Sequence, residues 1–113
     1  MRKIIMFAMA IVLCSTQFSY AHPPSRVEAA YDPETSAVSV MVYHDVKDPK
    51  THYVKKISVF VNGVQVLQDE YSQQSNDVDQ PAVYELRDLR TGDKVTVKAS
   101  CSISGEGSTT FTI

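Results

Sequence analysis

The residues of this sequence best suited to chemistry are its three histidines and one of its two cysteines: His22, His44, His52 and Cys101. Imidazole nitrogen and thiolate sulfur are ligands for iron, copper and zinc, and three or four of them on a rigid frame can fix a coordination geometry. A single loop histidine is usually only solvated, and a cysteine that alternates with apolar residues is usually part of a core. The metal-site hypothesis therefore depends on whether the fold brings these residues together.

Motifs of other common sites are missing from the sequence. It has no G-x-S-x-G elbow, no H-E-x-x-H helix, no phosphate-binding glycine loop and no paired C-x-x-C. A nucleophile pair of Cys101 with His52 stays open as an alternative, although no orienting motif supports it.

The first 21 residues are typical of a cleavable secretory signal peptide. Arg2 and Lys3 precede an unbroken apolar run over residues 4–13, and Ser19-Tyr20-Ala21 is a small-x-small cleavage pattern. The run is too short for a membrane-spanning helix, which needs about 20 residues. We therefore expect a periplasmic or secreted protein without stable membrane insertion.

The rest of the chain, residues 22–113, is long enough for one domain with one core. The whole chain has a net charge of -2, and two of its basic residues lie in the predicted signal peptide, so the domain is more acidic still. This charge disfavours nucleic acid as a partner. The oligomeric state stays open.

Cleavage would remove Cys14 and leave Cys101 without an intrachain disulfide partner. A lone cysteine in an exported domain can be a buried apolar residue, half of an intermolecular bridge or a metal ligand. A lipid anchor on Cys14 is a lesser alternative, because the bulky Leu13 precedes it where lipidation favours a small residue.

Period-two alternation and turn residues predict an all-β fold, an immunoglobulin-like β-sandwich of about seven antiparallel strands. Val38, Val40 and Val42 share one face of a strand, and Asn62-Gly63 predicts a type I′ hairpin turn. The expected strands cover residues 26–31, 37–43, 52–61, 64–71, 82–86, 94–101 and 108–113, with polar loops over 44–51 and 72–80.

Each candidate ligand lies at the end of an expected strand. His22 precedes the first strand, His44 and His52 flank the polar loop over residues 44–51, and Cys101 ends the sixth strand. In an antiparallel sandwich, strand ends from distant parts of the chain meet at one rim. The sequence therefore predicts that these side chains lie close together.

Two segments resemble the iron domain of desulfoferrodoxin and superoxide reductase. They are His44–Val59, which begins HDVKDPKTHYVKK, and Val97–Gly105, VKASCSISG. That family has a histidine, a short polar loop with proline, a second histidine and a late A-x-x-C-x-x-H-G motif. The resemblance covers most of residues 22–113 and implies a seven-stranded immunoglobulin-like sandwich that binds iron.

In that family four histidines and an axial cysteine hold the iron and leave one position for superoxide. The resemblance implies that His22, His44 and His52 are imidazole ligands and that Cys101 is the axial thiolate. It also implies reduction of superoxide to peroxide with electrons from a separate donor. The family's lysine beside the second loop histidine has its displaced counterpart in Lys50, which becomes the implied catalytic residue.

The fourth histidine of the family is replaced here by Ser104, so the implied ligand set is incomplete. Loss of one imidazole opens a second coordination position and should weaken iron binding; a site of three histidines and one cysteine can also accept zinc or copper. Two alternatives stay open. One is a non-catalytic binding module that has lost the metal, and the other is a copper carrier that uses the imidazole and the terminal amine of His22.

Overall fold

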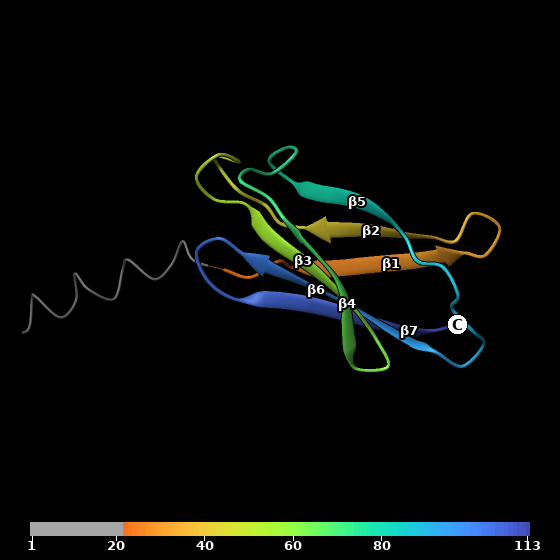
Figure 1. Cartoon of the computed structure of the whole chain (residues 1–113). Helices are drawn as coiled ribbons and strands as arrows, with labels where there is room; N and C mark the ends of the chain where they lie inside the picture. The colour runs from red at the N-terminus through yellow and green to blue at the C-terminus, as the bar shows by residue number, and fades with distance from the viewer. Residues whose placement is uncertain (1–21) are drawn as a thin grey trace, which may run out of the picture.

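The computed structural model describes residues 22–113, and the predicted signal peptide over residues 1–21 lies outside this part. Seven antiparallel strands form two sheets that pack as a sandwich (Figure 1), which confirms the predicted all-β fold. No helix within residues 22–113 is long and apolar enough to cross a membrane. The strands are β1 (Arg26–Asp32), β2 (Ala37–Tyr43), β3 (Val54–Val61), β4 (Val64–Glu70), β5 (Asp79–Glu85), β6 (Lys94–Cys101) and β7 (Glu106–Thr112).

Strands β1, β2 and β5 form one sheet in the order β1-β2-β5, and the other sheet has the order β4-β3-β6-β7. The inner faces of both sheets are lined by branched apolar side chains, as the alternation predicts. Full burial of one such side chain contributes roughly 1.5–3 kcal/mol to folding. The fully buried apolar residues of the central strands are Val38 and Val42 of β2, Val54, Ile57 and Val59 of β3, and Val95, Val97 and Ala99 of β6.

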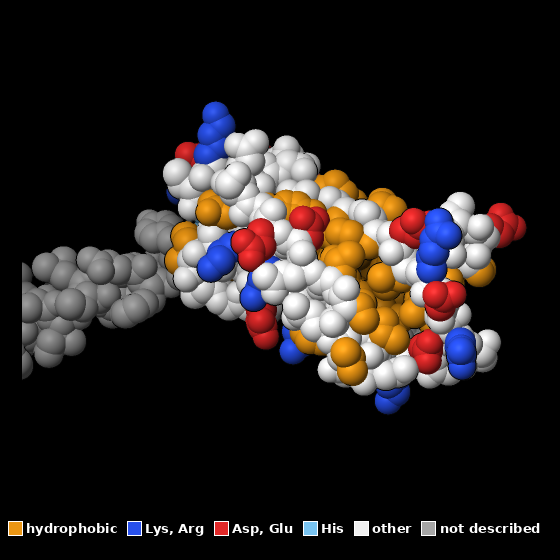
Figure 2. Space-filling view, viewed as in Figure 1, with side chains coloured by type: hydrophobic (Ala, Val, Ile, Leu, Met, Phe, Trp, Pro, Cys, Tyr) orange, Lys and Arg blue, Asp and Glu red, His pale blue; other side chains and the backbone are white. Residues whose placement is uncertain are grey.

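The two open sides of the sandwich are closed differently. On one side β1 lies beside β7, where a Cβ on Gly107 would lie 3.3 Å from the carbonyl oxygen of Pro24. On the other side, the hydroxyls of Tyr71 and Tyr84 both donate to Asp69 Oδ2 at 2.8 Å, which links β4 to β5. Burial raises the pKa of Tyr84 far above its ordinary value. Hydrophobic side chains form a band between β5 and β4 on the face in Figure 2.

The predicted type I′ turn is present, because Asn62 and Gly63 have the positive φ values, 51° and 84°, that it requires. Between β1 and β2, Asp32 Oδ1 accepts a hydrogen bond from the Glu34 backbone N–H. Strand β5 begins at Asp79, earlier than expected from the sequence, because its ladder with β2 continues to the pair Tyr43 and Asp79. Polar residues at the start of β5 give no alternation signal, although their backbones pair.

The ends of the strands bring the candidate ligands to one rim, at the left of Figure 1. Strands β2 and β6 end there, β3 begins there, and the segment before β1 passes over the same end. His44, His52, Cys101 and His22 lie next to these four strand ends.

Candidate metal centre

The three histidines form one cluster. Each offers a ring nitrogen, and these atoms all lie within 4.8 Å of one another. The ring centroids are 5.0 Å apart for His22 and His44, 4.9 Å for His22 and His52, and 4.8 Å for His44 and His52. His44 is fully buried, whereas His22 and His52 are partly exposed at the rim. The expectation that the three imidazoles lie together is confirmed.

His44 is placed by the backbone at the end of β2. Its N–H donates to the carbonyl oxygen of Val78 at 2.9 Å, which prolongs the pairing of β2 with β5. Its ring nitrogen Nδ1 lies 2.9 Å from Gln74 Oε1, and Nε2 lies 3.4 Å from the carbonyl oxygen of His22. Both ring nitrogens therefore face polar atoms inside the protein.

His52 is placed by a tight turn and by a link to β6. The backbone N–H groups of Thr51 and His52 both donate to the carbonyl oxygen of Asp48, at 3.1 and 3.0 Å. The next residue, Tyr53, exchanges two hydrogen bonds with Ser102: its N–H donates to Ser102 Oγ, and its carbonyl accepts from the Ser102 N–H. These contacts hold His52 against the end of β6.

Cys101 is 6% exposed at the end of β6. Its Sγ lies 3.1 Å from His52 Nε2 and also accepts a longer contact from the Ile103 N–H at 3.4 Å. The three histidines are the group whose nitrogen atoms all lie close to one another. The Cys101 thiol adjoins this group through its contact with His52. The structure thus brings all four candidate ligands to one place, with Cys101 at the edge of the cluster.

The contact between Pro23 and Gly105 places His22 beside the other candidate ligands. Gly105 has φ +84°, and a Cβ there would lie 2.8 Å from Pro23 Cβ, closer than real contacts allow. The Cys101 N–H donates to the Gly105 carbonyl at 3.0 Å, which closes the loop between β6 and β7 beneath this contact. A glycine is therefore required for the segment of His22 to approach the loop that follows Cys101.

The electrostatics of the cluster favour neutral imidazole at His52. Burial lowers the pKa of His52 below its ordinary 6.5, and repulsion from positive charge on His44 and His22 lowers that pKa further. At neutral pH this side chain therefore keeps a free electron pair. A neutral imidazole with a free electron pair is the form that binds a metal ion.

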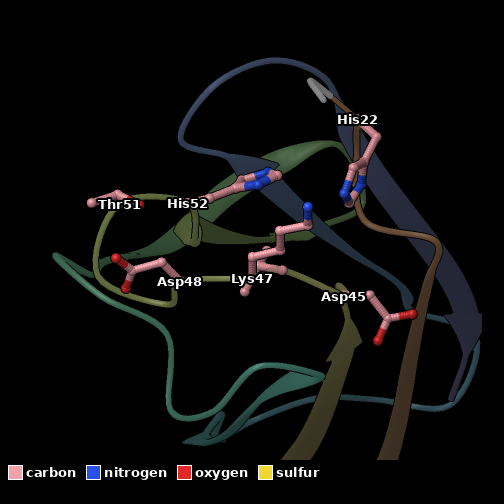
Figure 3. Close-up of a pocket in the computed structure, with 7 residues that line it drawn as sticks. His22, Asp45, Lys47, Asp48, Thr51 and His52 are labelled. Carbon is pink, nitrogen blue, oxygen red and sulfur yellow. The ribbon is translucent and has the colours of Figure 1, made fainter. Parts of the chain in front are cut away.

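A cavity of about 410 Å³ opens beside the cluster and is lined in part by His22, Lys47 and His52. In Figure 3 the side chain of Lys47 extends toward the space between the two imidazoles. Lys50 lies in the exposed turn before His52 and does not line this cavity. Its catalytic role therefore stays a prediction.

The donor set fits a transition metal ion. Imidazole nitrogen and thiolate sulfur are both ligand types that zinc takes, and they also suit iron or copper. The set does not match the four-imidazole iron site of the family that the sequence resembles, because the position of the fourth histidine is the exposed Ser104.

Two residues of the site were missed by sequence reasoning. Gln74 lies in the predicted polar loop over residues 72–80 yet is only 3% exposed and contacts His44. Lys47 lies in the other predicted loop, where the sequence resemblance selects Lys50 instead. No family model matches the chain, and neither a curated protein nor a solved structure matches it.

Proposed function

We propose that the domain binds one transition metal ion through His22, His44, His52 and Cys101. The observation that supports this most is the convergence of three imidazoles from separate parts of the chain, with ring nitrogens within 4.8 Å of one another. The thiol in contact with His52 adds a fourth donor. Burial of a polar imidazole costs free energy and does not strengthen a hydrophobic core, whereas a metal ion would coordinate all three imidazoles.

Iron is the metal we propose first. The sequence resembles superoxide reductase around the loop histidines and Cys101, and a thiolate ligand increases the electron density on ferrous iron. Zinc and copper suit the same donors. Copper is the second candidate, because the ligand His22 directly follows the predicted cleavage site after Ala21 and would then offer its amine as well.

The reaction that fits an iron site here is one-electron reduction of superoxide. Superoxide would accept one electron from the ferrous ion and two protons from solvent and would leave as hydrogen peroxide. The cavity beside His22 and His52 gives a small anion access to the cluster, and the side chain of Lys47 supplies a positive charge on its wall. A separate electron donor would then reduce the ferric ion.

We also propose that the domain works outside the cytoplasm, in the periplasm or as a secreted protein. The support is the predicted signal peptide over residues 1–21. Mass spectrometry of protein recovered from the exported fraction gives the first residue of the mature chain. Cleavage after Ala21 predicts His22 at that position.

The test of metal binding is elemental analysis combined with absorption spectroscopy of the purified domain. We expect one metal ion per chain, and the ferric form should show a thiolate-to-iron charge-transfer band in the visible region. In Cys101→Ser this band should disappear while iron is still held by the imidazoles, more weakly. His44→Ala, which removes the buried imidazole, should abolish stoichiometric binding.

Lys98→Ala serves as the control, because Lys98 is exposed on β6 away from the rim and should leave both signals unchanged. A domain that binds no transition metal, or a charge-transfer band that persists in Cys101→Ser, would contradict the proposed ligand set. Stoichiometric copper without iron would support the carrier function instead. Reduced, iron-loaded protein that superoxide oxidises no faster than a metal-free control would exclude the enzymatic reaction and leave metal binding intact.

A further inference from the structure

Gln74 is a buried side chain whose hydrogen bonds join both arms of the metal site. It lies between β4 and β5 and is 3% exposed. Its backbone N–H donates to the carbonyl oxygen of Pro49 at 2.9 Å, in the loop between His44 and His52. Its side-chain amide contacts His44, Asn76 and the first residue of β3, Val54. One amide therefore holds the residues that follow β2 and the residue that starts β3.

The orientation of this amide is determined by backbone groups. One terminal atom lies 2.8 Å from the carbonyl oxygen of His44 and 2.9 Å from that of Asn76, so it must be the nitrogen, which donates both hydrogens. The other accepts the Val54 N–H at 3.0 Å, so it must be the oxygen, Oε1. Exchange of the two atoms would place an oxygen against two carbonyl oxygens.

This orientation determines the proton position on His44. Ring nitrogen Nδ1 lies 2.9 Å from Gln74 Oε1, which can only accept, so Nδ1 must carry a hydrogen. A neutral imidazole has one N–H, so Nε2 keeps its electron pair. That electron pair faces the carbonyl oxygen of His22 at 3.4 Å, where two acceptors meet without a proton between them. A cation beside Nε2 would relieve this contact.

We propose that Gln74 is a positioning residue that holds His44 as the Nδ1–H tautomer and so makes Nε2 its metal donor. This inference rests on the metal-binding function proposed above. All four hydrogen-bonding positions of the amide are used: the oxygen accepts from Val54 and His44, and the nitrogen donates to His44 and Asn76. No other side chain has both the two donors and the two acceptor positions at this length.

Substitutions of Gln74 test the hydrogen bonds of the amide oxygen and of the amide nitrogen separately. In Gln74→Met the acceptor is lost, so His44 is free to adopt the Nε2–H tautomer that isolated imidazole side chains prefer. In Gln74→Glu an acceptor remains, so His44 should keep Nδ1–H even though the two donated bonds are lost. Gln80→Met is the matched control, because Gln80 is equally buried and binds Ser75 and Pro81 at the same end of β5.

The experiment is long-range ¹H–¹⁵N NMR of the histidine rings in metal-free protein at about pH 8, above the ordinary histidine pKa. It is followed by titration with Co²⁺, read from the thiolate charge-transfer band. Wild type, Gln74→Glu and Gln80→Met should show the Nδ1–H form of His44, and Gln74→Met should not. Cobalt affinity should fall about 10–100-fold in Gln74→Met, as for other residues that orient a ligating histidine, and should stay near wild type in Gln80→Met.

Two results would overturn the inference: the Nε2–H form of His44 in wild type, or unchanged cobalt affinity in Gln74→Met. If Gln74→Met does not fold, the wild-type tautomer and the Gln74→Glu variant still decide the question. Nδ1–H at His44 in a wild-type protein that binds no metal would overturn the metal-binding function, and with it the donor role of Nε2, while the tautomer assignment would stand. The two failures are therefore distinguishable.

Discussion

Lys47 and Lys50 lie in the same loop, and their positions relative to the metal site differ. Lys47 lines the cavity beside His22 and His52, whereas Lys50 lies in the exposed turn whose backbone is held by Asp48. The sequence resemblance implies Lys50 as the catalytic residue, because it lies nearer His52 along the chain. Spacing alone does not tell which lysine of an irregular loop turns inward.

We predict that Lys47→Met weakens binding of azide, a stable anion, to the ferric protein about fivefold. The substitution removes a positive charge that attracts the anion. The effect is small because an exposed ion pair contributes at most about 1 kcal/mol. Azide affinity can be read from the change in the iron absorption spectrum. Lys50→Met is the matched control and should bind azide as wild type does. Equal weakening in both variants, or an effect of Lys50→Met alone, would favour the sequence-based assignment.

The candidate ligands were predictable because histidine and cysteine are distinctive residue types at strand ends. Gln74 was not, because it is one of several polar residues in a loop and nothing in its neighbours marks it as buried. Its side-chain amide is buried against backbone groups of His44, Val54 and Asn76, to which it is hydrogen-bonded, and two of these lie 20 or more residues away in the sequence. Such long-range hydrogen bonding gives no local periodic signal.

Among the structural elements, the loop between β6 and β7 contacts the segment that carries His22 and the backbone of Cys101, two of the candidate ligands. Gly105 in this loop lies against Pro23, and the Cys101 N–H donates to its carbonyl oxygen. The strand pattern predicted a connection between the strands over residues 94–101 and 108–113 but gave no indication that the segment before β1 packs on it. That contact depends on the arrangement of the two sheets, which pairs β1 with β2 and places it beside β7.

We predict that Gly105→Ala lowers metal affinity about tenfold or more, because the added Cβ displaces Pro23 and with it His22. The backbone strain of alanine at positive φ should also lower the free energy of unfolding by roughly 1–2 kcal/mol. Metal titration and urea denaturation measure the two effects.

Gly63→Ala is the matched control for backbone strain. Gly63 also has φ +84°, but nothing lies within 4 Å of a Cβ built on it. This variant should lose a similar free energy of unfolding and keep the metal affinity of wild type. Equal metal affinity in the two variants would show that Gly105 does not position His22.

At the scale of the whole molecule, the sandwich has two different ends. The rim with the histidines is held by loop contacts, and the opposite end, where β3 ends and β6 begins, is held by Asp93 and Asn62. Asp93 accepts hydrogen bonds from the Arg90 backbone N–H at 2.8 Å and from the Asn62 amide at 3.0 Å. The backbone bond from Arg90 and the side-chain bond from Asn62 lower the pKa of Asp93 below its ordinary 3.8.

We predict that Asp93, at the end of the sandwich opposite the histidines, makes the stability of the fold sensitive to acid. The pKa of Asp93 is lower in the folded protein than in the unfolded chain. The ionised carboxylate therefore stabilises the fold fully at a pH above the pKa of the unfolded chain, and this contribution is lost as the pH falls through the pKa of the folded protein. Urea denaturation across about pH 6 to 2 should show the stability advantage of wild type over Asp93→Asn shrinking at the acid end. A constant difference over that range would contradict the role of the carboxylate.

The four candidate ligands span most of the domain, from His22 before β1 to Cys101 at the end of β6. An extended chain passing through an export channel therefore holds no site, because the ligands come together only when both sheets have formed. For the proposed site, the choice of metal would then depend on the compartment in which the chain folds. If the chain folds after translocation, it acquires its ion from the metal pool of the destination compartment, and the cytoplasmic pool has no part in the choice.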